Sequence, residues 1–175
     1  MFNSQIWDIA FCFLTLLLVL MRQWCNISIN FIVKLSNSNE YTNVMIVVNQ
    51  LTKMRHMISL KTLDIIEVAK AFTKNVFKLH ELPDTIVSDR EGQFVLTFWK
   101  TLCKRLNIEA WLLTAFHPET DDQTENANMI MKQYLWMYCS YLQDDWEKWL
   151  SLTEFTVNNM MNKSTNVILF YMTYE

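Results

Sequence analysis

Residues 27–35 read ISINFIVKL, and residues 43–50 read NVMIVVNQ. Both stretches are short, apolar and rich in β-branched side chains, which is typical of buried β-strands. The polar segment SNSNEYT at 36–42 lies between them and favours a turn. A third strand is predicted at 54–60 after only a few residues, so the second and third strands are expected to form a hairpin.

Helical and strand patterns alternate after this hairpin. Asp64 and Glu67 resemble a capping pair in front of the first helical pattern. The predicted elements are helices at 64–80, 94–106, 124–142 and 146–158 and strands at 85–88 and 109–113. Three leading strands followed by alternation predict an α/β fold, in which a mixed five-stranded sheet carries helices on both faces.

The composition indicates one globular domain and excludes two kinds of site. The 175 residues are 51% hydrophobic and 19% charged, with a net charge of -3, so the chain can bury a core and has no basic excess. Glycine occurs once, at Gly92, which excludes a glycine-rich phosphate loop. Four cysteines without a CxxC pair and three scattered histidines do not form a zinc-finger pattern.

The N-terminal region contains a 13-residue apolar run from Ile9 to Met21. A membrane-spanning helix needs about 20 apolar residues. A signal peptide needs a positively charged start, which MFNSQIWD lacks. We therefore expect residues 1–23 to be an apolar segment outside a domain at 24–175. A packed extra element, a misplaced gene start and a minor membrane association remain alternatives.

Two polar segments carry the residues suited to chemistry. Residues 88–94 read SDREGQF after a predicted strand, and residues 117–125 read HPETDDQTE before a predicted helix. Asp89 and Glu125 are separated by 35 residues. Carboxylates at a strand end and on the first turn of a helix can converge and bind Mg²⁺. Two such ions can support phosphoryl transfer.

These motifs, S-D-R-x-x-Q-F and H-P-x-T-D-x-Q-T-E, resemble the catalytic core of retroviral-type integrases, in particular those of Ty3/gypsy-type long-terminal-repeat retrotransposons. Shorter matches at Leu51–Met54 and Val76–His80 agree, and the likeness runs from about Trp24 to Glu175. The resemblance implies a ribonuclease-H-like fold, DNA 3′-end processing and strand transfer into target DNA. It also implies a D,D-35-E triad that holds Mg²⁺ or Mn²⁺, with Asp89 as the second acid and Glu125 as the third.

The resemblance also implies partners and a location. The partners are the DNA ends of the element, target DNA and a second copy of the chain, without a small-molecule substrate, and the location is the nucleus. Gln123, Asn128 and Lys132 match positions that contact DNA in the family. For Asn128 and Lys132, a solvated helix face is an equally good interpretation.

The first acid of the triad is missing from the pattern. The family reads D-F-I in the first strand, where this chain has Asn30-Phe31-Ile32. A neutral amide brings no charge to offset two divalent ions, so we expect weaker metal binding and impaired chemistry. Asn49-Gln50 stands for the family's Asp-Arg, and Glu91 and Asp122 stand for glycines. These departures favour a degenerate copy, a pseudoenzyme. The alternatives are an active integrase that tolerates Asn30 and a non-catalytic module that binds nucleic acid or dimerises.

Overall fold

The computed structural model describes residues 23–88, 92–106, 133, 135–161 and 168. Within these residues no helix is both long and apolar enough to cross a membrane. The apolar run at 9–21 lies outside them, as do the predicted fifth strand at 109–113 and most of the predicted helix at 124–142.

The described strands form one mixed sheet. They are β1 (Asn26–Ile32), β2 (Asn43–Asn49), β3 (Arg55–Leu60) and β4 (Thr85–Ser88), in the spatial order β3-β2-β1-β4. β1 pairs antiparallel with β2 and parallel with β4, and β2 pairs antiparallel with β3. The predicted hairpin is therefore confirmed. β1 ends at Ile32, before the predicted Leu35, and Lys34 has a positive φ of 60°.

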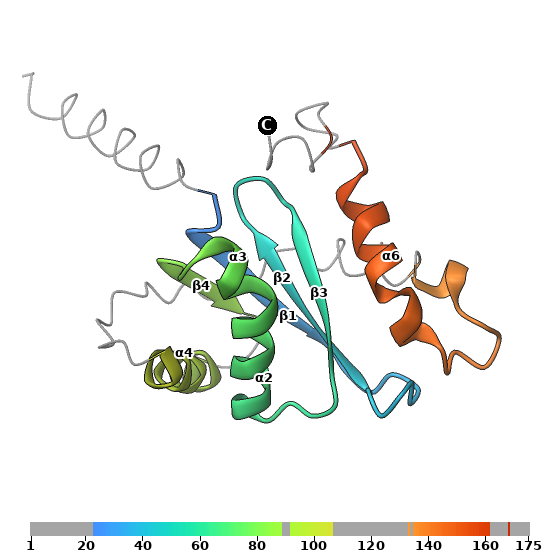
Figure 1. The fold of residues 1–175 in the computed structure, drawn as a ribbon, viewed down its shortest axis with the longest axis horizontal. Coiled ribbons are helices and arrows are strands. Elements are labelled where there is room, and N and C mark those ends of the chain that lie inside the picture. Colours follow the sequence, from blue (N-terminus) through green and yellow to red (C-terminus); the bar gives the residue numbers. More distant parts are fainter. Residues whose placement is uncertain (1–22, 89–91, 107–132, 134, 162–167, 169–175) are drawn as a thin grey trace, which may run out of the picture.

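Helices cover both faces of this sheet, as the strand pattern predicts (Figure 1). The alternate side chains Ile27, Ile29 and Phe31 of β1 belong to a core shared with α2 and α4. On the opposite face, Ile32 and Ile46 pack in a second core with residues of α6. Successive side chains of a strand point to opposite faces of the sheet. Because apolar residues occupy both odd and even positions, the sheet is buried on both sides.

The predicted helix at 64–80 is present but is not uniform. It consists of α2 (Ile65–Phe72), a π-helical turn η1 (Thr73–Phe77) and α3 (Lys78–His80). Thr73 Oγ1 donates to the Ala69 carbonyl and Asn75 Nδ2 donates to the Ala71 carbonyl, at 2.7 and 2.8 Å. Such side-chain bonds compete with the regular backbone ladder, which accounts for the wider turn.

The predicted capping pair is confirmed for Asp64 and corrected for Glu67. The Asp64 carboxylate accepts a hydrogen bond from the Ile66 amide. Glu67 does not reach back to the Asp64 amide. Its carboxylate accepts bonds from the amides of Lys61 and Thr62 instead, and so ties the β3–α2 connection to the helix.

The later helices largely agree with the predicted ranges. α4 spans Gly92–Leu106 and α6 spans Trp146–Asn158. Residues 135–138 are helical, and Leu135 is buried against α6. The helix predicted at 124–142 extends to Leu142, but the observed helix has ended by then. Leu142 lies in a turn and is 73% exposed.

Candidate functional site

Asn30 is the one predicted triad position that the structure describes. It lies in β1, opposite Ile46 of β2, and is only 3% exposed. Its neighbour Ile29 pairs with Ser88, the last residue of β4. Asn30 is therefore buried in the sheet at the carboxyl end of β4, which is the edge where the sequence predicts the chemistry.

The described surroundings of Asn30 leave its amide nitrogen without a partner. Its Nδ2 is buried and has no hydrogen-bond partner within the described part of the chain. An asparagine side chain carries two N–H donors, whereas an ionised carboxylate has acceptors only. A buried donor without a partner costs about 1–3 kcal/mol. The amide at this position is thus a poor fit to its site.

Asn49 provides an internal comparison, since the family also has an aspartate there. Asn49 is fully buried, but its Nδ2 donates to Thr52 Oγ1 at 2.8 Å and its Oδ1 accepts from the Leu51 amide at 3.1 Å. The amide therefore closes the β2–β3 turn with both of its functions in use. The same kind of replacement is accommodated at Asn49 and leaves an unmatched donor at Asn30.

The other predicted site residues lie outside the described residues. This applies to Asp89, Glu125, Gln123, Asn128 and Lys132. Among the residues that are described, no three His, Cys, Asp or Glu side chains are grouped so that they could hold a metal ion. Asn30 is therefore the only predicted ligand whose environment can be examined.

The chain is similar in sequence to transposon polyproteins. Over 155 residues, 88% of the chain, it is 26% identical to the Transposon Tf2-3 polyprotein of Schizosaccharomyces pombe and equally to the Tf2-4 polyprotein. The chain spans only 12% of the length of these curated relatives. No protein-family model matches it.

The fold is similar to that of solved integrase catalytic core domains. The HTLV-2 integrase catalytic core domain, solved in complex with magnesium, superposes with a TM-score of 0.62 at 15% identity, over 86% of this chain and 97% of that one. The chain resembles Tf2 transposon polyproteins in sequence and has the fold of a retroviral integrase catalytic core. The catalytic core domain of BIV integrase superposes on this chain with a TM-score of 0.57, at 15% identity, over 85% of this chain and 93% of that one. The ribonuclease-H-like fold expected from the sequence is confirmed.

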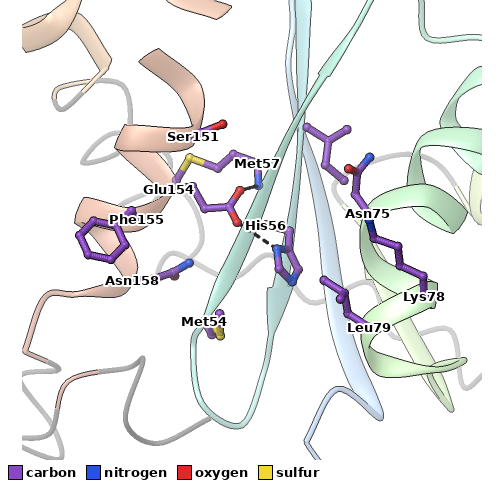
Figure 2. A pocket seen from close by; sticks show the side chains of 11 residues that line it. Met54, His56, Met57, Asn75, Lys78, Leu79, Ser151, Glu154, Phe155 and Asn158 are labelled. Carbon is purple, nitrogen blue, oxygen red and sulfur yellow. Dashed lines mark hydrogen bonds and ion pairs between the residues drawn. The ribbon is translucent and has the colours of Figure 1, made fainter. Parts of the chain in front are cut away.

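The described part of the chain also has a pocket lined by residues other than Asn30. A cavity of about 390 Å³ lies between α6 and the η1–α3 segment, beside β3 (Figure 2). Its lining residues include Met54, His56, Lys78, Leu79, Glu154 and Phe155. Leu79 and Phe155 are each 56% exposed. The pocket therefore combines exposed apolar side chains with an imidazole, a carboxylate and an ammonium group.

Sequence reasoning missed the polar groups of this pocket. The sequence offered only three scattered histidines, whereas in the structure the His56 ring contacts both His80 and Glu154. The contacting side chains are 24 and 98 residues apart in the chain. Neither spacing matches a local motif, so only the folded structure brings these residues together.

Proposed function

We propose that this chain is a retrotransposon integrase core by descent, whose substrate is DNA and whose ancestral reaction is strand transfer. The proposal rests on the homology to transposon polyproteins, the integrase-core fold and the position of Asn30. Asp89 follows Ser88 directly in the sequence, and Ser88 pairs beside Asn30. This continuity supports a site made of position 30, Asp89 and Glu125.

The unmatched Nδ2 of Asn30 is the single observation that carries the proposal of impaired activity. The solved HTLV-2 integrase core contains magnesium. Asn30 does not fit a magnesium centre built on three carboxylates, because it offers one neutral oxygen and presents a buried donor without a partner among the described residues. Asp89 and Glu125 can still supply hard anionic ligands. The proposed site would then hold DNA near two carboxylates instead of three.

Gln123, Asn128 and Lys132 are proposed as the DNA-contacting side chains. A net charge of -3 means that sequence-independent DNA binding should be weak and should fall steeply with salt. We also propose that residues 24–175 form the integrase-like unit and act in the nucleus. Trp24 supports this boundary, because it is 3% exposed and already packs in the core.

A branched DNA that mimics the integration product tests the proposal. The full chain and its Asn30→Asp variant would be assayed for cleavage and rejoining with Mg²⁺ and with Mn²⁺. We expect only the variant to react, and reaction by the natural protein would refute the proposed impairment. If neither reacts while both melt cooperatively, the chain is a folded non-catalytic module.

Dimerisation is the second candidate function, and the exposed apolar side chains favour it. Leu79 and Phe155 border the pocket between α3 and α6. The HTLV-2 integrase core has been solved in dimeric and trimeric forms. We propose that this chain forms a homodimer through this surface. Sedimentation of the natural chain and of Phe155→Lys tests it, and an unchanged mass in the variant would contradict the surface.

A further inference from the structure

A cluster of four side chains joins β3, α3, α6 and the turn at Trp24, which precedes β1. The Trp24 ring stacks on His80 with centroids 4.0 Å apart and planes 7° apart. His56 Nε2 lies 2.8 Å from His80 Nε2, and His56 Nδ1 lies 3.0 Å from Glu154 Oε1. Glu154 Oε2 accepts a hydrogen bond of 2.7 Å from the Met57 amide. Figure 2 shows Glu154 reaching from α6 to both β3 groups.

The two imidazole rings meet head to head. Their centroids are 5.0 Å apart while their Nε2 atoms are 2.8 Å apart, so both nitrogens lie between the ring centres. A hydrogen bond of this kind needs one proton, shared by a donor and an acceptor nitrogen. Glu154 requires a proton on His56 Nδ1. The pair can therefore be neutral or carry one extra proton, but a second extra proton would place two N–H groups face to face.

We propose that His56 and His80 form a proton-dependent clasp, which holds α3 and the turn before β1 on β3 and opens when both rings are charged. Opening separates His80 from His56 and Trp24, whereas the charged His56 stays bound to the Glu154 carboxylate. This proposal is independent of the DNA chemistry proposed above.

The cluster also protects the edge of the sheet. β3 is an edge strand of the described sheet, and its outward backbone groups are bonded by side chains of α6. Glu154 accepts from the Met57 amide, and Asn158 accepts from the Arg55 amide and donates to the Arg55 carbonyl. Unpaired groups on an edge strand are a template for association with other chains. The side chains of α6 therefore cover this edge of the sheet.

The charges around the pair agree with this behaviour. Glu154 faces His56 from α6, Lys78 lines the same pocket from α3, and Glu81 follows His80 in the chain. Arg55 is adjacent to His56 in β3, so its side chain leaves the strand on the other side. Burial, followed by repulsion from His56, lowers the pKa of His80 to about 4.

The sign of the pH effect follows from that lowered pKa. The unfolded chain protonates His80 near pH 6.5, whereas the folded chain resists protonation until about pH 4. Stability from this site is therefore complete above pH 6.5 and is lost as the pH falls towards 4. Since His80 is partly exposed, each pH unit in this window should lower the folding equilibrium constant by less than the tenfold limit for one proton.

Proton NMR and urea unfolding of the full chain test the clasp. We expect the His80 ring resonances to remain those of the neutral form down to pH 5. The indole protons of Trp24 should shift together with His80. His80→Gln should flatten the decline of stability between pH 6.5 and 4.5, and the matched control His117→Gln should not.

Three outcomes would overturn the proposal. One is a protonation midpoint of His80 near pH 6.5 in the folded protein. Another is protonation of His80 without any change at Trp24, which would mean that the clasp stays closed. The third is a His80→Gln variant whose stability declines with pH in parallel with that of the natural chain. The NMR measurement uses the natural protein, so it decides the question even if a variant fails to fold.

Discussion

The Asn30→Asp substitution should make the stability of this protein depend on Mg²⁺. The introduced carboxylate would replace a side chain that is 3% exposed and packed in the middle of β1. Burial raises the pKa of a carboxyl group from its usual 3.9 by up to about 3–5 units. At pH 7 the penalty reaches at most about 4 kcal/mol, because the group becomes protonated once its pKa exceeds the pH. Asn30 lies opposite Ile46 in the apolar strand β2. We therefore expect the introduced carboxylate to incur much of this penalty when no Mg²⁺ is bound.

The melting temperature measures this penalty and its relief. A loss of about 4 kcal/mol corresponds to a decrease of about 8–16 °C for a domain of this size. Mg²⁺ present at about 100 times its dissociation constant contributes about 2.7 kcal/mol, or about 5–11 °C. We therefore expect the variant to melt well below the natural protein in EDTA and to recover about two-thirds of the difference in Mg²⁺.

Ser28→Asp is the matched control, because Ser28 is two residues from Asn30 on the same face of β1. It adds the same charge to the same strand face away from the predicted site, so Mg²⁺ should not restore its stability. If Mg²⁺ raises the melting temperature of the natural protein as much as that of Asn30→Asp, the amide is an adequate ligand. An Asn30→Asp variant that gains nothing would show that position 30 is not part of a metal site.

Substitutions at three further positions test the core, a helix cap and a surface ion pair. Phe72→Ala empties a fully buried position and should lower the unfolding free energy by about 3–5 kcal/mol in urea titration; a loss below 1 kcal/mol would contradict the assigned core. Asp64→Ala removes the acceptor of the Ile66 amide and should lower stability by about 1 kcal/mol, whereas Asp64→Asn should retain most of it. Glu40→Gln breaks an exposed contact with Lys61 and should leave the urea midpoint unchanged, so a shift as large as that of Asp64→Ala would refute this assignment.

Local patterns predicted most of the described elements. The β2–β3 hairpin, β4 and α6 lie within one or two residues of their predicted limits, because strand and helix periodicity is a property of neighbouring residues. The π-helical turn at Thr73–Phe77 was not predicted. It accompanies two side-chain hydrogen bonds to backbone carbonyls, and such bonds have no periodic signature. Leu142 was misplaced for a related reason, since apolar spacing alone does not mark where a helix ends.

For the candidate site, too, some features could be predicted from the sequence and others required the folded structure. The sequence by itself determined the integrase resemblance and the replacement at Asn30, because motif spacing and residue identity are local and can be read directly. Only the tertiary structure distinguished Asn30 from Asn49, since whether an amide finds a partner depends on groups contributed by other segments. It alone brought His56, His80 and Glu154 into contact, because α3 and α6 must both pack against β3 before these side chains meet. Hydrogen-bond satisfaction and protonation are properties of the assembled environment, and no single stretch of sequence contains that environment.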